Sequence, residues 1–102
     1  MKVIEGLQQL LGWCRERKRA YQLSFRSPAG VEVLEDLSKF CRAFEPTFHE
    51  DPRVHALLEG RREVWLRIQE WLDLTPEELT AIKSGNRVQL LHPEGHATEN
   101  DQ

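Results

Sequence analysis

Two histidines and an aspartate are the first residues of this sequence whose types and spacing could support chemistry. His49, Asp51 and His55 carry imidazole and carboxylate groups, which bind metals such as zinc. His49 and Asp51 precede a helix predicted to start at Pro52, however, and no fourth ligand stands at a spacing typical of a metal site. We therefore interpret the histidines as surface residues near a helix start, and we expect no metal and no cofactor.

The sequence also lacks the patterns of an enzyme. Gly60-Arg61-Arg62 falls inside a predicted helix and does not follow a strand, so it is not typical of a phosphate-binding loop. No serine or cysteine has a base at a recognisable spacing. Cys14 and Cys41 each lie on an apolar helical stripe, which favours small buried thiols over a disulfide. We expect a non-enzymatic protein without a small-molecule substrate.

The most basic stretch of the chain lies near its N-terminus. It consists of Arg15, Arg17, Lys18 and Arg19, with Glu16 among them. Such a patch can bind phosphate groups, although a solvated helix face is the more common role. The formal net charge is -3 and the sequence pI is near 5.8, so the bulk charge does not favour nucleic-acid binding. A phosphate-binding patch therefore stays an alternative.

The length and the apolar runs of the chain indicate its class. A chain of 102 residues is long enough for one domain. On folding, a chain of this size buries roughly two-thirds of the surface that it exposes when unfolded. The longest apolar run is too short to span a bilayer. The first residues lack the pattern of a signal peptide. We expect a soluble, cytoplasmic protein with no membrane partner.

Three helices are predicted from apolar residues at helical spacing. The first covers residues 3–24, the second begins at residue 28, and the third covers residues 52–72. Ser27 and Asp51 each precede a proline, and their side-chain oxygens can accept hydrogen bonds from the first amides of a helix. These two positions therefore predict the starts of the second and third helices.

A shorter helix and a polar tail are predicted to follow. A capping box formed by Thr75 and Glu78 predicts a fourth helix that ends near Lys83. Residues 85–102 are too polar to fold alone, so we expect a flexible tail. Its contacts with the domain would come from three apolar residues, Val88, Leu90 and Leu91. The sequence therefore predicts a single all-α domain over residues 1–84, a small three-helix bundle with a short fourth helix.

Gly60 and Arg61 are unusual residues for the interior of the predicted third helix. A glycine there costs about 1 kcal/mol relative to alanine, so we predict that a neighbouring helix crosses closely over Gly60. Arg61 falls on the apolar stripe, where an unpaired charge is costly. We expect Arg61 to pair with Asp36, or else with Glu59 or Glu32. In the alternative interpretation its side chain only extends to the rim of the core.

Two tryptophans widen the apolar faces of the predicted helices. Trp13 lies about 90° from the centre of the first stripe, and Trp71 lies on the flank of the third. A lone three-helix core requires neither side chain. We therefore predict that both belong to a protein interface, and simple packing under the tail is the alternative.

Two stretches of the sequence resemble a known family. They are FRSPAGVEVLEDLSKFCRAFEPTF and EDPRVHALLEGRREVWLRIQEWLDLTPEEL. Together they are similar to the Bbp-nineteen-like family of small proteins of tailed phages and prophages, typified by a protein of a Bordetella podophage. The resemblance covers residues 25–79. The residues that carry it are Phe25, Gly30, Val33, Leu34, Asp36, Leu37, Phe40, Asp51, Gly60, Arg61, Arg62 and Ile68.

The resemblance implies a phage-encoded helical protein whose gene lies among the portal, scaffold and capsid genes. It implies a place in the host bacterial cytoplasm or in the virion, and it supplies no catalytic residues. We therefore expect a protein that acts in virion assembly or structure. Its partner would be another virion-morphogenesis protein or a second copy of the chain. The alternative is a nucleic-acid or host-factor binding protein that uses the basic face of the first helix.

Overall fold

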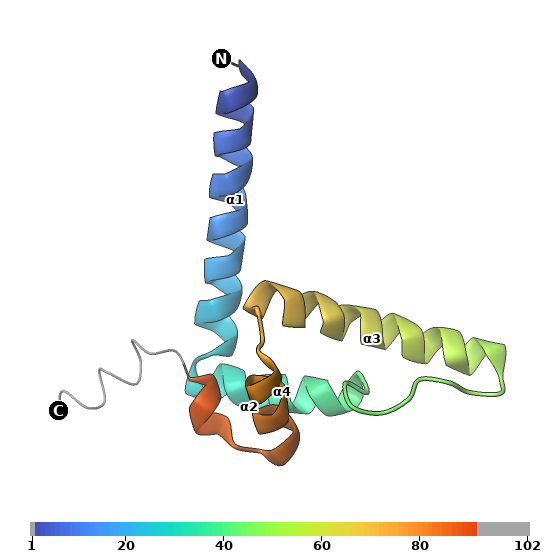
Figure 1. Cartoon of the computed structure of the whole chain (residues 1–102). Helices are drawn as coiled ribbons and strands as arrows, with labels where there is room; N and C mark the ends of the chain where they lie inside the picture. Colours follow the sequence, from blue (N-terminus) through green and yellow to red (C-terminus); the bar gives the residue numbers. More distant parts are fainter. Residues whose placement is uncertain (1, 92–102) are drawn as a thin grey trace.

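The computed structural model describes residues 2–91, which form four α-helices and one short 3-10 helix (Figure 1). They are α1 (Lys2–Phe25), α2 (Pro28–Phe40), α3 (Pro52–Leu72), α4 (Pro76–Ser84) and the 3-10 helix η1 (Arg87–Leu90). The all-α fold with a short fourth helix is confirmed. None of the helices described has the length and apolar character required to cross a membrane.

The helix starts predicted from capping residues before proline are confirmed. The Ser27 side chain accepts a hydrogen bond from the Gly30 amide at 3.0 Å, and Asp51 accepts one from an amide two residues later at 2.9 Å. At α4 the Thr75 hydroxyl accepts from the Glu78 amide, while the Glu78 carboxylate accepts from the Thr75 amide. Each cap satisfies an amide that has no partner within the first helical turn.

The helices meet at one end and do not pack along their whole lengths. In Figure 1, α1 stands almost upright and α3 runs away from it, so the N-terminal half of α1 projects from the domain. The Cα radius of gyration is 16.9 Å, compared with about 13 Å for a compact domain of this size. The helical bundle is therefore more open than the predicted three-helix bundle, because the N-terminal half of α1 lies away from α2 and α3.

The hydrophobic core lies where α2, α3, α4 and η1 meet. Trp65 of α3 is its largest fully buried side chain, with 1% of its surface exposed. The other core residues are Val31, Leu34, Cys41, Ala43, Ile68, Leu72, Ile82 and Leu90. Tyr21 and Phe25, from the last turns of α1, pack against this core. Burial of these two rings attaches the C-terminal end of α1 to the domain.

The residues directly after α4 fold back onto the core. Leu90 is buried, Leu91 is half-buried and Val88 is exposed. Arg87 Nε donates a hydrogen bond to Glu35 Oε2 of α2 at 3.0 Å. The folded part therefore includes residues up to 91, beyond the predicted boundary at residue 84, because Leu90 completes the core. The rest of the predicted tail lies outside the described residues.

The close approach of two helices occurs at Gly30 and not at Gly60. A Cβ atom added to Gly60 would meet no atom within 4 Å, so the predicted helix crossing there is wrong. A Cβ atom on Gly30 would lie 1.8 Å from the Ser24 carbonyl oxygen and 2.7 Å from the Phe25 Cα atom. The reason is the two-residue link between α1 and α2, which brings the first turn of α2 against the last turn of α1.

Arg26 in this link connects the ends of three elements. Its guanidinium donates hydrogen bonds to the carbonyl oxygens of Leu72 at 3.0 Å and Leu90 at 3.3 Å, and it pairs with the Glu78 carboxylate. The Arg26 and Glu78 side chains are 11% and 16% exposed. Burial raises the pKa of Glu78, but hydrogen bonds from Arg26 and the Thr75 amide outweigh it, so the pKa is lowered. Sequence reasoning identified Glu78 only as a cap and did not single out Arg26.

Candidate interaction surface

Residues 3–14 of α1 form a projecting helical arm with an exposed apolar stripe. Most of its apolar residues are spaced by three or four and so lie on one face of the helix. The exposed large apolar residues of this stripe are Val3, Ile4, Leu7, Leu10 and Leu11. Leu7, near its middle, is 55% exposed. A contiguous exposed apolar stripe is typical of an interaction site.

Trp13 and Trp71 meet at the base of the arm, where α1 crosses α3. Their ring centroids are 6.1 Å apart, and the Trp71 ring also stacks on Tyr21 with centroids 5.9 Å apart. Trp13 is nevertheless 46% exposed, whereas Trp71 is half-buried. The structure brings the two residues together and uses part of their surface to fix the arm to α3. Their role in a protein interface stays a prediction.

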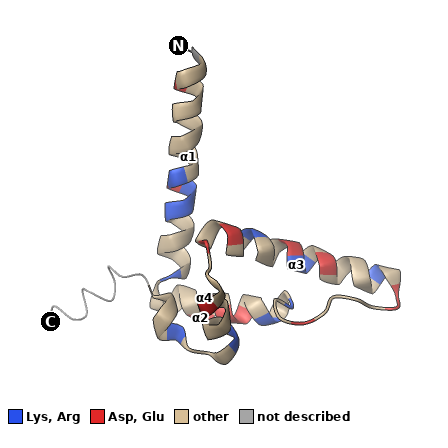
Figure 2. Cartoon of the chain, in the orientation of Figure 1, with Lys and Arg blue, Asp and Glu red and all other residues tan. Residues whose placement is uncertain are grey.

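Basic side chains form a band on α1 just after the arm (Figure 2). The residues of this basic band are all exposed: Arg15, Arg17, Lys18 and Arg19. The Arg17 guanidinium carbon lies 4.8 Å from the Trp13 ring centroid, and Lys18 Nζ lies 3.7 Å from the Asp73 carboxylate. Arg15 and Arg19 form no ion pair within the described part of the chain. Phosphate binding by the band stays a prediction.

Arg61 contacts an aromatic ring and does not pair with Asp36. Its guanidinium carbon lies 4.3 Å from the Phe40 ring centroid. Among residues 2–91 it forms no ion pair with Asp36, and none with Glu59 or Glu32. The predicted ion pair is therefore wrong. A guanidinium over an aromatic face is stabilised by the ring quadrupole, so this half-buried cation has a favourable contact without a counter-charge.

We expect Arg61 and Phe40 to be energetically coupled by about 0.5–1 kcal/mol, the usual size of a cation–π contact near the surface. A double-mutant cycle with Phe40→Leu and Arg61→Met, measured by denaturant unfolding, checks this value. The matched cycle with Asp36→Asn and Arg61→Met should be additive within about 0.5 kcal/mol. Coupling to Asp36 without coupling to Phe40 would contradict the observed contact.

Arg62, beside Arg61, fixes the loop that follows α2. Its Nη1 donates hydrogen bonds to the carbonyl oxygens of Arg42 at 3.2 Å and Glu45 at 3.0 Å. Arg42 has a φ of 54°, a left-handed conformation that costs a non-glycine residue about 1 kcal/mol or more. Arg62 therefore stabilises a strained turn. Other residues that carry the sequence resemblance pack in or against the core: Phe25, Leu34, Leu37 and Ile68.

The residues considered for metal binding lie at the start of α3. The Asp51 amide donates a hydrogen bond to His49 Nδ1 at 3.0 Å, and the Asp51 side chain caps α3. His55 Nδ1 lies 3.1 Å from the Thr47 carbonyl oxygen. In the part of the chain that the structure describes, no three His, Cys, Asp or Glu side chains are grouped so as to hold a metal ion. The contacts observed for these histidines therefore support the start of α3.

The two cysteines are free thiols. Cys41 is buried in the core, and Cys14 is half-buried on α1. Burial raises the pKa of the Cys41 thiol more than the nearby Arg61 cation lowers it. Because the thiolate is the reactive form of cysteine, a raised pKa makes Cys41 less reactive. This environment favours a packing role for Cys41.

The helical domain without the arm corresponds to a known protein family. A family model described as "Bbp19-like phage protein" matches residues 21–84, which is well over half of the chain. The match includes α2, α3, α4 and the end of α1, and it excludes the arm, the basic band and η1. Comparison with curated proteins and with solved structures gives no significant match. The resemblance seen in the sequence is confirmed, and the chain belongs to the family of Bbp19-like phage proteins.

Proposed function

We propose that this phage protein is not an enzyme and acts through protein–protein contacts in virion assembly or structure, in the head and portal region. The observation that carries the proposal is the apolar stripe of the arm, exposed on a helix that projects from the family domain. Exposed apolar surface is unfavourable in water and becomes stabilising when a partner covers it. Membership of a phage protein family supports a phage partner.

The arm has the features of a segment that gains stability from a partner. A helix of about 12 residues is marginal in water when nothing packs on it. Trp13 at its base is almost half exposed and lies beside Arg17, and tryptophan and arginine are enriched among the residues that dominate interface energies. A partner that covers the arm would therefore also contact the side chains at its base.

The basic band supports a second candidate function, binding of nucleic acid or of a host factor. Arg15 and Arg19 are exposed and form no ion pair within residues 2–91. The net charge of -3 does not favour general attraction to nucleic acid. The two candidates differ in their response to salt, because phosphate contacts weaken steeply with ionic strength whereas an apolar contact does not.

We expect the tagged full-length protein to capture a head, portal or tail protein from lysates of induced or infected cells, at low and at high salt. Trp13→Ser should lower this recovery because it removes a large exposed ring at the base of the arm. Val88→Ser is the control, since Val88 is also an exposed apolar residue, 63% exposed against 46% for Trp13, but lies on η1. Captured proteins are identified by mass spectrometry, and circular dichroism verifies that both variants are folded.

The outcomes of this capture separate the two candidates. Loss of the phage protein with Trp13→Ser, and its retention with Val88→Ser, would support the proposal. Equal recovery by wild type and Trp13→Ser would show that this surface is not the interface. Salt-sensitive DNA as the sole partner would favour the basic band as the functional site.

A further inference from the structure

A pocket of about 350 Å³ lies between the C-terminal part of α1 and α3. Tyr21 and Phe25 line it from α1, and Val64 and Ile68 line it from α3. Val64 is 54% exposed, so the pocket is open to solvent. Its volume falls within the range of about 300–1,000 Å³ that is usual for ligand pockets. The pocket is therefore large enough to receive an apolar group of a ligand.

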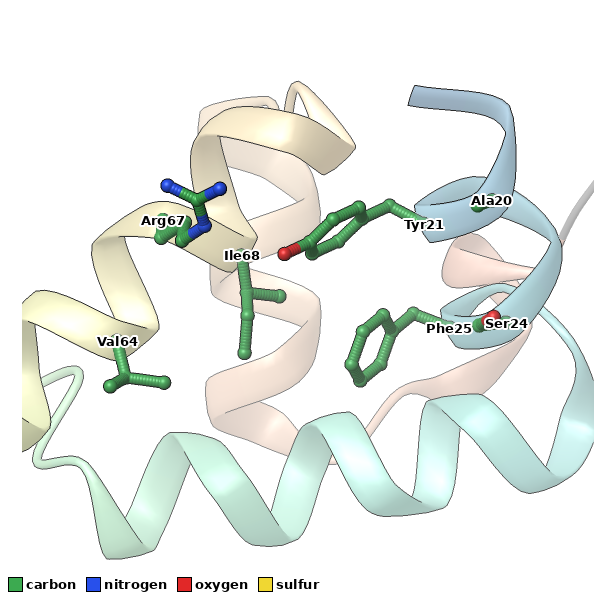
Figure 3. A pocket seen from close by; sticks show the side chains of 7 residues that line it. All are labelled: Ala20, Tyr21, Ser24, Phe25, Val64, Arg67 and Ile68. Carbon is green, nitrogen blue, oxygen red and sulfur yellow. The ribbon is translucent and has the colours of Figure 1, made fainter. Parts of the chain in front are cut away.

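The pocket has a polar side and an apolar side (Figure 3). Arg67 also lines it, and Figure 3 shows Arg67 and the Tyr21 hydroxyl on the side away from α2. Phe25 and Val64 lie on the side nearer to α2. A tyrosine hydroxyl can donate a hydrogen bond, and a guanidinium is a permanent cation with several donors. A ligand that fits both sides therefore carries an acceptor group beside an apolar body.

The charges at the pocket favour an anion as this acceptor group. None of the described residues that line the pocket is Asp or Glu. Arg67 forms no ion pair within the part of the chain that the structure describes. Glu63 and Glu70 stand one turn before and after it, on the flank of α3 away from Val64. The Arg67 guanidinium is therefore available to an anion that enters the pocket.

Two more arginines border the pocket. Arg61 stands three residues before Val64, and Arg17 stands four residues before Tyr21, so each lies one helical turn from a lining residue. Both guanidinium groups lie over aromatic rings of the same chain, and neither has an ion-pair partner among residues 2–91. The electrostatic field of these cations therefore also attracts an anion to the pocket.

The short separation of the polar and apolar sides limits the kind of ligand. Arg67 and Val64 are three residues apart on α3, so their Cβ atoms are about 5–6 Å apart. The anion and the apolar group must therefore be close neighbours in the ligand. The last residue of a protein chain carries a carboxylate directly beside its side chain. A carboxylate also matches a guanidinium in geometry, because the two groups can form a pair of parallel hydrogen bonds.

We infer that the pocket binds the C-terminal residue of a partner protein, and that this residue is aromatic. Its carboxylate binds Arg67 and Tyr21, and its ring lies among the apolar side chains of the pocket. Unlike the arm, the pocket residues Tyr21, Phe25, Val64, Arg67 and Ile68 lie in the part of the chain that the family model matches. The inference rests on the proposed function only for the identity of the partner.

Binding of N-acetyl-phenylalanine to the purified full-length protein tests the inference. The acetyl group of this probe stands for the residue before the chain end. NMR of the isotope-labelled backbone should show shifts at residues 20–25 and 64–68, with a dissociation constant of about 1 mM for a probe of this size. The neutral probe N-acetyl-phenylalaninamide should bind about fivefold more weakly or less, because it lacks the carboxylate.

Variants of α3 separate the roles of charge and apolar contact. Arg67→Met should weaken binding of the acid by about fivefold or more and leave binding of the amide unchanged. Arg53→Met, at the other end of the same helix, is the matched control and should bind like wild type. Val64→Trp should fill the pocket and weaken both probes, whereas Leu66→Trp places the same ring on the opposite face of α3. Circular dichroism verifies folding, which is expected because all four side chains are exposed.

Hydrocinnamate distinguishes the end of a protein chain from a free small acid. It carries the same ring and a carboxylate, but it lacks the acetamido group at the point where a chain would continue. We expect N-acetyl-phenylalanine to bind at least as tightly, because the open side of the pocket leaves room for the chain. Binding of hydrocinnamate without binding of N-acetyl-phenylalanine would overturn the assignment to a chain end.

Three other results would overturn the inference: no shift at the pocket residues, equal affinity for the acid and its amide, or no effect of Arg67→Met on binding of the acid. The experiment uses the purified chain and small probes, whereas the proposed function is tested by capture of a phage protein. A failure of one is therefore distinguishable from a failure of the other.

Discussion

Gly30→Ala should lower the free energy of unfolding by about 3 kcal/mol or more. The added Cβ atom would lie 1.8 Å from the Ser24 carbonyl oxygen and 2.7 Å from the Phe25 Cα atom. Both are backbone atoms at the end of α1, so relief of the clash requires α1 and α2 to separate. Denaturant unfolding followed by circular dichroism measures the loss.

Gly60→Ala is the matched control for this prediction. No atom lies within 4 Å of the position that its Cβ would take, and alanine is favoured over glycine inside a helix by about 1 kcal/mol. We therefore expect Gly60→Ala to stabilise the domain by about 0.5–1 kcal/mol. A Gly30→Ala protein as stable as wild type would contradict the close approach of α1 and α2.

Arg26→Met should destabilise the domain by about 3 kcal/mol, the lower end of the range for removal of one partner of a buried ion pair. The substitution leaves the Glu78 carboxylate without its cation, and the Leu72 and Leu90 carbonyl oxygens without this donor. Arg53→Met is the control, because the Arg53 side chain is exposed and makes no hydrogen bond or ion pair among residues 2–91. Denaturant unfolding of both variants should show a large loss for the first and almost none for the second.

The same ion pair predicts a loss of stability in acid. Burial raises the pKa of Glu78, but the hydrogen bonds from Arg26 and the Thr75 amide outweigh it and hold the pKa below its ordinary value of 4.5. A carboxyl with a lower pKa in the folded state adds stability above its unfolded pKa, and this stability is lost as the pH falls through the folded pKa. Unfolding free energies measured below about pH 4.5 should therefore decline more steeply for wild type than for Glu78→Gln. Equal slopes would show that Glu78 titrates alike in both states.

The family match covers one part of the chain and leaves the N-terminal part of α1 outside it. The family model covers residues 21–84, whereas the arm and the basic band lie before them.

The sequence by itself determined where the helices begin and to which family the chain belongs. Ser27, Asp51 and Thr75 each accept a hydrogen bond from an amide two or three residues later. A contact of this kind depends on neighbouring residues of the chain, so the types and order of the residues are sufficient to predict it. The same holds for the apolar spacing that predicted the helices, because residues three and four apart share a face in every α-helix.

Only the tertiary structure decided how the faces of these helices meet. Periodicity identifies residues that share a face, but the short link at Arg26 sets the direction of α1, and this direction leaves the arm exposed. The same link places the Ser24 carbonyl against Gly30. A side chain would therefore clash at Gly30 and not at Gly60 in the middle of α3. The hydrogen-bond and ion-pair partners of Arg26 stand 46 to 64 residues further along the chain, and no local pattern reveals contacts at such a separation.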